Sequence, residues 1–287
     1  MTSPPARSAT TAPAPEIQEA AAARLELARA AAAEVAEMAL AVYQSPELVT
    51  ARKEDGSLVT PVDRDGERRI RELVAGRFAD DAILGEEHGA TAGTSGWTWV
   101  IDPIDGTRSF VHGMPSFCTL IGIEHHGVPI AGLATWPALG EAVSAILGRG
   151  ASWRTHRGGV RPCRVSDVVV PGRATIELGA PSSFAGVGRG DAHPVFAAAV
   201  RRIRGWDDGL AFGLVATGRI DGAVQCGLSR WDLSAFVPVM AEAGGIITAW
   251  DGGDPLAPPG CVLAGPPELV HALAAFAGGA GGMHRAD

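Results

Sequence analysis

Cysteine is sparse in this chain, and its placement argues against two common kinds of structural site. The 287 residues include four cysteines, and no two of them form a Cys-x-x-Cys pair. They lie at Cys118, Cys163, Cys226 and Cys261. This spacing does not favour a disulfide framework or a tetrahedral zinc site. We therefore expect reduced thiols in a cytoplasmic protein.

Long apolar runs are also missing. No stretch of the sequence reaches the roughly 18 consecutive apolar residues that a membrane-spanning helix needs, so we expect no membrane partner. Residues 1–15 are rich in Pro, Ala, Thr and Ser and lack the apolar core of a secretory signal. We interpret residues 1–15 as a disordered tail and the glycine-rich residues 278–287 as a loose C-terminus.

Positive charge is in deficit. The chain has 24 Lys and Arg against 32 Asp and Glu, which gives a formal net charge of −8. Non-specific nucleic-acid binding relies on dense Lys and Arg, so a nucleic-acid partner is disfavoured. An anionic substrate would need bound cations to reverse the local charge. Apolar residues make up 46% and charged residues 20%, which is typical of a globular protein.

The hydrophobic pattern alternates between helical and strand periods along the whole chain. Residues 16–43 contain no Gly or Pro and carry apolar residues at helical spacing, which predicts a long amphipathic helix. Further helices are expected at 64–78, 193–203, 209–217 and 267–276, and another opens at 231. Strands are expected at 58–62, 97–101, 117–123, 128–135, 141–147, 174–178, 220–225, 246–250 and 261–264, with a loop at 148–162. This mixture indicates an α/β or α+β fold in two halves that meet near 164–170.

One strand is expected to end in an acidic turn. The apolar run 99–101 leads into Asp102 and Asp105, which lie three residues apart. Pro103 cannot donate to a strand ladder, and Gly106 tolerates backbone conformations that other residues resist. Two carboxylates and the Thr107 hydroxyl from one loop suit a hard cation such as Mg²⁺. A solvated acidic turn is the alternative interpretation.

Three more acidic residues lie at the ends of predicted elements. Glu86 follows a short apolar run and Gly85, while Asp63 and Asp232 each fall at the start of a helix. Asp is also a favoured helix N-cap, so a capping role explains the last two equally well. The pattern alone does not bring these acids together.

Four motifs resemble one protein family. Asp102-Pro-Ile-Asp-Gly-Thr107 and Trp231-Asp-Leu-Ser-Ala235 are similar to the two signatures of the inositol monophosphatase family. Leu84-Gly-Glu-Glu87 and Val59-Thr-Pro-Val-Asp63 resemble its remaining motifs, in the same order. The resemblance covers residues 16–276. It implies a five-layered α/β/α/β/α sandwich of two subdomains, 16–165 and 166–277, that is usually a homodimer. It also implies Mg²⁺-dependent hydrolysis of a small phosphate ester.

The resemblance assigns roles residue by residue. It implies two or three Mg²⁺ ions: Glu86, Asp102 and the carbonyl of Ile104 would hold the first. Asp102, Asp105 and Asp232 would hold the second. Asp63 would pair with Thr107, and Glu86 with Thr107 would hold the water that attacks phosphorus. The amides of Gly106 and Thr107 would bind the phosphate at a helix start, where the backbone favours an anion.

The substrate stays open among several phosphate esters. Arg108, residues 114–122 and Asp208 resemble the histidinol-phosphatase branch, whose substrate belongs to histidine biosynthesis. Gln225 departs from that branch and from the inositol branch, because relatives of both commonly carry a Glu at that position. Inositol 1-phosphate, another cyclitol phosphate or a sugar phosphate is the alternative. A non-catalytic metal-binding or regulatory homologue is a second class, although no metal-site acid is replaced.

Overall fold

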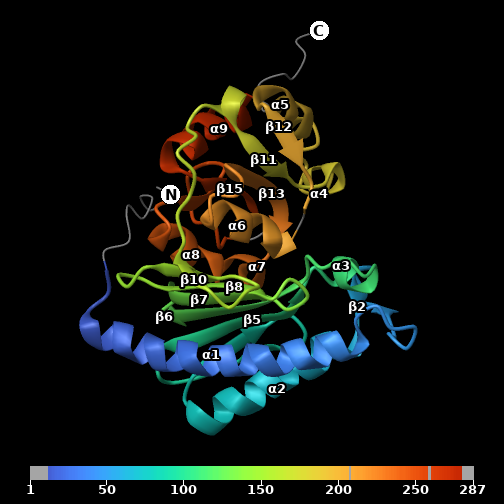
Figure 1. Ribbon diagram of the computed structural model, residues 1–287, viewed down its shortest axis with the longest axis vertical. Helices are drawn as coiled ribbons and strands as arrows, with labels where there is room; N and C mark the ends of the chain where they lie inside the picture. Colours follow the sequence, from blue (N-terminus) through green and yellow to red (C-terminus); the bar gives the residue numbers. More distant parts are fainter. Residues whose placement is uncertain (1–11, 207, 258–259, 280–287) are drawn as a thin grey trace.

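The computed structural model describes residues 12–206, 208–257 and 260–279. Helices and sheets stack in five layers (Figure 1), which are the layers that the resemblance implied. The first layer pairs two long helices, α1 (Pro15–Val42) and α2 (Pro61–Arg77). Before α2, β1 (Ala51–Arg52) and β2 (Leu58–Val59) form a small antiparallel hairpin.

The second layer is an eight-stranded, mostly antiparallel sheet that α1 and α2 cover. In spatial order its strands are β10 (Val160–Pro162), β9 (Ala151–Arg154), β8 (Glu141–Ile146), β7 (Val128–Trp136), β6 (Cys118–His125), β5 (Trp97–Asp105), β3 (Ala82–Gly85) and β4 (Gly89–Thr91). Among the described strands of this sheet, only β3 and β5 pair in parallel. Parallel pairing places the C-terminal ends of these two strands side by side. Glu86 directly follows β3, and Asp102 and Asp105 lie at the end of β5.

Three short helices form the middle layer, between the two sheets. They are α6 (Asp208–Ala216), α7 (Arg230–Leu233) and α8 (Phe236–Glu242). The fourth layer is a five-stranded sheet in the order β12 (Arg202–Arg204), β11 (Thr175–Leu178), β13 (Gly222–Leu228), β15 (Gly260–Gly265) and β14 (Ile246–Ala249). The outer layer contains α4 (Pro181–Gly186), α5 (Ala192–Ala199) and α9 (Pro267–Gly279). Two short helical segments lie between strands: α3 (Thr107–Val111) joins β5 to β6 within the large sheet, and the 3₁₀ turn Pro171–Arg173 lies between β10 of the large sheet and β11 of the small one.

Each interface between layers buries its own apolar cluster. Val35 of α1 and Ile70 of α2 pack with Trp99 under the large sheet. Trp136 and Phe236 lie between the two sheets, in the cluster that the middle helices complete. A third cluster joins the small sheet to the outer helices. Burying apolar area at about 25 cal/mol per Å² is the main stabilising contribution of such layers.

Helix α1 confirms the prediction from periodicity. The side chains of Leu25, Ala28, Ala32 and Val35 recur on one helical face, and all are buried. The helix begins at Pro15, a residue that is favoured at the first helical position because its missing N–H would be unpaired there. The predicted tail up to residue 11 and the C-terminal segment from residue 280 lie outside the described residues.

Four predictions of local structure were wrong. The strand expected at 58–62 ends at Val59, and α2 already begins at Pro61. The predicted loop 148–162 contains the edge hairpin β9–β10. The whole segment is rich in Arg and Gly, and β10 is exposed along its length, so the apolar pattern of a buried strand is missing. The helix expected at 193–203 ends at Ala199, and the chain then extends into β12, which pairs with β11. The helix opening at 231 is two helices, α7 and α8.

The expectation of four reduced thiols was also wrong. A disulfide joins Cys226 of β13 to Cys261 of β15, whereas Cys118 and Cys163 are free and buried. The two bonded cysteines are directly opposite in the antiparallel ladder, with their Cα atoms 3.9 Å apart. Their separation along the chain is 35 residues, so only the strand register reveals the pair. No helix among the described residues is long and apolar enough to cross a membrane.

Candidate active site

A cavity of about 230 Å³ lies where segments of both halves of the chain meet. Its walls come from the end of β5, the start of α3, α6 and α7 between the sheets, and the end of β13. Most of the residues that the sequence singled out line it. They are Glu86, Asp102, Ile104, Asp105, Gly106, Thr107, Asp208, Gln225 and Asp232.

Three carboxylates form the centre of this cavity. Asp102 and Asp105 come from the end of β5, where the register with β6 shifts between them. Asp232 comes from the first turn of α7, where its Oδ2 accepts from the Ser229 N–H at 2.6 Å. One oxygen of each carboxylate lies within 4.8 Å of an oxygen of the other two. An oxygen-only cluster of this size fits a hard divalent cation.

Burial and repulsion by neighbouring carboxylates raise the pKa values of all three carboxyls. Burial is the largest cause for Asp102, followed by the charges of Glu86 and Asp105, and its pKa lies well above the usual range. Burial and Asp208 do the same to the pKa of Asp105. The pKa of Asp232 rises from 3.8 to about 7, again mainly through burial. A bound cation would relieve this repulsion, because opposite charge favours the ionised carboxylates.

Polar neighbours fix the orientation of Asp105. Its Oδ2 accepts from the Gly209 N–H at 2.6 Å and from the Cys118 thiol at 3.1 Å. Gly209 belongs to the first turn of α6, and a Cβ there would lie 2.8 Å from the same oxygen. The absence of a side chain at Gly209 therefore lets α6 approach the carboxylate closely.

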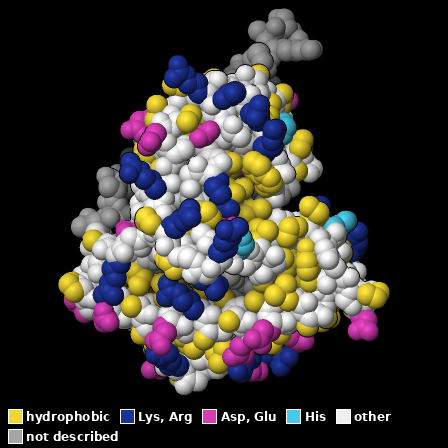
Figure 2. All heavy atoms as spheres, viewed as in Figure 1, with side chains coloured by type: hydrophobic (Ala, Val, Ile, Leu, Met, Phe, Trp, Pro, Cys, Tyr) yellow, Lys and Arg dark blue, Asp and Glu magenta, His cyan; other side chains and the backbone are white. Residues whose placement is uncertain are grey.

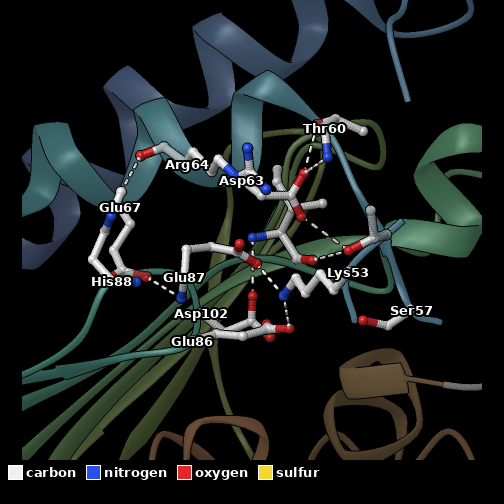
Figure 3. A network of polar contacts seen from close by, with 12 residues as sticks. Lys53, Ser57, Thr60, Asp63, Arg64, Glu67, Glu86, Glu87, His88 and Asp102 are labelled. Atoms are coloured by element: carbon white, nitrogen blue, oxygen red, sulfur yellow. Dashed lines mark hydrogen bonds and ion pairs between the residues drawn. The ribbon is translucent and has the colours of Figure 1, made fainter. Parts of the chain in front are cut away.

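Glu86 lies beside the triad and forms an ion pair with a lysine. The Lys53 ammonium donates to Glu86 Oε1 at 2.7 Å and also to Glu87, as the close-up shows (Figure 3). Burial lowers the pKa of Lys53, but the hydrogen bonds to both carboxylates outweigh it and raise the pKa above its ordinary value. The sequence reasoning missed this residue. Lys53 is the only lysine in the chain, but no spacing in the sequence connects it with Glu86.

A fully buried carboxylate holds the backbone of the loop that follows Glu86. Glu67 of α2 accepts from the Glu87 N–H at 2.7 Å and from the His88 N–H at 3.2 Å (Figure 3). A Cβ on Gly85 would lie 2.0 Å from Glu67 Oε1. Glycine is therefore required before Glu86, and Glu67 is a second residue that the sequence reasoning did not identify.

Asp63 is connected to the cavity by a hydrogen bond from Thr107. The N-cap of α2 is Thr60, not Asp63, and Asp63 completes a capping box as the third helical residue. Its Oδ2 accepts from the Thr60 N–H at 2.8 Å, and its Oδ1 accepts from the Thr107 hydroxyl at 2.9 Å. Burial raises the pKa of Asp63, against the lowering effect of these hydrogen bonds. Asp63 thus holds Thr107 without itself lining the cavity.

The turn after β5 brings the chain against α6. Gly106 has φ +77°, in the left-handed region, and a Cβ there would lie 2.5 Å from Asp208 Oδ2. The Asp208 carboxylate accepts from the Ser109 hydroxyl at 2.9 Å. This contact joins α3 to α6 beside the cavity that Asp208 lines. Glycine is therefore needed at Gly106 for both its backbone conformation and its packing.

Gln225 lines the cavity and contacts a buried acid. Its amide nitrogen donates to Glu177 Oε2 at 3.0 Å and to the Asp208 carbonyl at 3.4 Å. Glu177 is fully buried and was not expected at the site. Arg108, by contrast, is exposed and is not among the residues that line the cavity.

Comparisons with known proteins agree with this geometry. The model of the inositol monophosphatase family matches residues 18–277. The chain is 36% identical over 202 residues to a histidinol-phosphatase of Chlorobaculum parvum, covering 67% of this chain and 73% of that protein. It is 32% identical over 235 residues to an inositol-1-monophosphatase of Mesorhizobium japonicum, covering 79% and 85%. The solved structure of the extragenic suppressor protein suhB from Bartonella henselae superimposes with a TM-score of 0.81 at 28% identity, covering 88% of this chain and 98% of that one.

Proposed function

The chain belongs to the inositol monophosphatase family, and from its site we propose that it is a Mg²⁺-dependent enzyme that hydrolyses histidinol phosphate. Family membership makes it a phosphoric monoester hydrolase. The observation that carries the metal-dependent chemistry is the meeting of Asp102, Asp105 and Asp232 in one cavity. The metal, the residue roles and the identity of the ester are our proposals.

The acidic residues divide into two overlapping ligand sets. Glu86, Asp102 and the Ile104 carbonyl would hold one Mg²⁺, and Asp102, Asp105 and Asp232 would hold a second. When bound, two or three such ions neutralise the phosphoryl oxygens and acidify water. Lys53 compensates part of the negative charge at Glu86. The donor set fits the ion because Mg²⁺ prefers oxygen ligands, carboxylates above all.

Thr107 and Glu86 are placed to hold the attacking water. The Thr107 hydroxyl has a single proton, and its shorter contact directs that proton to Asp63 at 2.9 Å. Its lone pairs are then left to accept a hydrogen bond from water. Glu86 offers a carboxylate to the same cavity. The water attacks phosphorus in line with the departing alcohol, so no covalent phosphoenzyme forms.

The backbone at the start of α3 is the proposed phosphate site. Gly106 turns the chain through a left-handed conformation directly before Thr107, the first residue of α3. Backbone N–H groups at such a turn can donate to phosphate oxygens, and they carry no side chain that would block the approach. Both residues line the cavity.

The preference for histidinol phosphate rests on the polar groups beyond the phosphate site. Asp208 and the carbonyl oxygen of Gln225 are acceptors, because the Gln225 amide nitrogen is engaged by Glu177. Histidinol phosphate presents an ammonium and an imidazole, which are donors, and a carboxylate attracts the ammonium more strongly than it attracts a hydroxyl. Arg108 stays a predicted substrate contact that would have to reach in from the exposed side of α3.

Inositol 1-phosphate is the alternative substrate, since it presents hydroxyl donors to the same acceptors. The similarity to a relative named inositol-1-monophosphatase favours it. Another cyclitol or sugar phosphate would use the same contacts.

The test is a panel of esters assayed for phosphate release with Mg²⁺. We expect the highest kcat/KM for histidinol phosphate. Asp208→Asn should lower that value by at least about tenfold, through loss of a charged contact, while the value for inositol 1-phosphate changes little. Asn is the matched substitution because Asp208 has φ +54°, a conformation that Asn tolerates. Much faster turnover of inositol 1-phosphate would overturn the substrate assignment and leave the phosphatase activity intact.

Three further expectations stay predictions. They are the homodimer, the cytoplasmic location and the division into subdomains at residue 165. The described chain leaves the large sheet after Pro162 and enters the small one at Thr175, so a protease cut between these residues would test the division.

A further inference from the structure

A second cavity, of about 590 Å³, lies between α1 and the outer strands of the large sheet. None of the residues that line it lines the active site. Helix α1 contributes Arg29, Ala33, Ala36 and Leu40, which follow one another at helical spacing. Its volume is within the range of pockets that hold small molecules.

The strand register explains why this cavity exists. Two rows of directly paired residues run across β7 to β10 and face α1. One row is Leu133, Ser144 and Ser152, and the other is Thr135, Ala142, Arg154 and Val160. Most of these side chains are small, and α1 presents alanines opposite them. The helix and the sheet therefore do not fill the space between them.

Two arginines give the cavity its charge. The Arg29 guanidinium donates to the Ser144 hydroxyl at 2.8 Å, and Arg154 is close enough to affect it. Burial and then the charge of Arg154 lower the pKa of Arg29. Neither arginine forms an ion pair with any of the described carboxylates.

Neighbouring charges do not neutralise this pair. Glu141 also lines the cavity, but Arg219 holds its carboxylate at 2.9 Å and the Trp153 N–H donates to it. By contrast, Arg24 on the same helix pairs with the Asp81 carboxylate. The positive charge of the cavity is therefore uncompensated, in a chain whose net charge is −8.

Apolar surface accompanies this charge. The side chains of Leu40 and Val160 at the cavity rim are 46% and 69% exposed. Figure 2 views this face and shows hydrophobic and basic side chains next to one another in the band above α1. Large apolar residues this exposed are few among the described residues, and two of them border one cavity. An exposed apolar rim beside a concave surface is typical of a binding site.

We propose that this cavity binds a small amphipathic anion. Its carboxylate, phosphate or sulfonate group lies between Arg29 and Arg154, and its apolar body lies over Ala36 and Leu40. Guanidinium groups match such oxyanions because their N–H donors form a planar fork. The apolar walls select against a bare inorganic ion. This site is independent of the proposed phosphatase activity, because it shares no residue with the catalytic cavity.

The probe for the test is 8-anilinonaphthalene-1-sulfonate, which joins a sulfonate to an aromatic body and fluoresces when bound. We expect saturable binding with one site per chain at fixed ionic strength. Arg29→Gln and Arg154→Gln should each weaken binding by about tenfold, through loss of a charged hydrogen-bond donor. Ala36→Trp should abolish binding by filling the cavity. The matched control is Arg68→Gln on α2, whose side chain is 62% exposed outside this cavity.

Measurements of the activity, melting temperature and molecular mass of the variants complete the test. The three cavity variants should keep the phosphate-release activity and the melting temperature of the native protein. Equal binding by the native protein and both arginine variants would overturn the proposal, as would displacement of the probe by Mg²⁺ with inorganic phosphate. A change of molecular mass in light scattering for the arginine variants would also overturn it, because the cavity would then be a contact between two copies of the chain.

Discussion

Asp232→Asn should stabilise the metal-free protein while it removes a metal ligand. Burial, and then the charges of Glu86 and Asp208, raise the pKa of Asp232 from 3.8 to about 7, although the Ser229 N–H works in the opposite direction. A pKa unit corresponds to about 1.4 kcal/mol, so ionising this carboxyl in the folded, metal-free protein costs about 4 kcal/mol. Asn keeps an oxygen that can accept from the Ser229 N–H, so the cap of α7 survives.

The sign of the pH dependence follows from the raised pKa. The protonated carboxyl contributes stability that is fully present below the unfolded pKa near 4, and that is lost as the pH rises through 7. Between pH 5 and pH 8, Asp232 alone should reduce the free energy of unfolding by about 3 kcal/mol. Asp232→Asn lacks this pH-dependent contribution, so its free energy of unfolding should fall less between pH 5 and pH 8.

Urea unfolding in EDTA at pH 5 and pH 8 measures both proteins. Saturating Mg²⁺ should reverse the trend for the native protein, because metal binding requires ionised carboxylates and strengthens as they lose protons. Asp232→Asn should gain much less stability from Mg²⁺. The structure indicates that the carboxylates of this cavity repel one another. The same pH dependence of stability for both proteins in EDTA would contradict this.

Three other predictions concern the scaffold and the phosphate loop. Arg24→Ala should lower the free energy of unfolding by about 3 kcal/mol or more in urea, because it leaves the buried Asp81 carboxylate without its cationic partner; a loss below 1 kcal/mol would contradict this. Gly106→Ala should raise KM for the phosphate ester about tenfold, from a strained left-handed backbone, and an unchanged KM would rule this out. Thiol titration of unfolded, unreduced protein should count two thiols and then four after reduction, since Cys226 is bonded to Cys261; four at the outset would show that no disulfide forms.

Apolar periodicity in the sequence predicted those helices and strands whose buried residues recur at regular spacing. The spacing of Leu25, Ala28 and Val35 fixed the buried face of α1, because a helix returns to the same side every three or four residues. The apolar run before Asp102 marked a strand that is buried along its length. The strand β9 and the edge strand β10 were not predicted, because β9 is fully buried only at Ala151 and β10 is exposed throughout, so neither shows an apolar face in the sequence.

The sequence identified the motifs of the site but not the contacts between them. Asp102 and Asp232 were recognised from family signatures, yet only the packing of α7 against β5 brings them together. Lys53 and Glu67 were missed, because their partners lie on other elements and no local spacing encodes them. Cys226 was missed for the same reason, since its partner is set by strand register.

The central claim is that the acidic cavity is a Mg²⁺-dependent phosphatase centre. The most direct test is phosphate release from the best ester of the panel by the native protein and by Asp102→Asn, each with Mg²⁺ and with EDTA. We predict release only by the native protein with Mg²⁺, and a decrease of about a thousandfold or more for Asp102→Asn at unchanged fold, because several kcal/mol of transition-state stabilisation are lost. Release that persists in EDTA, or near-native activity of Asp102→Asn, would contradict the claim.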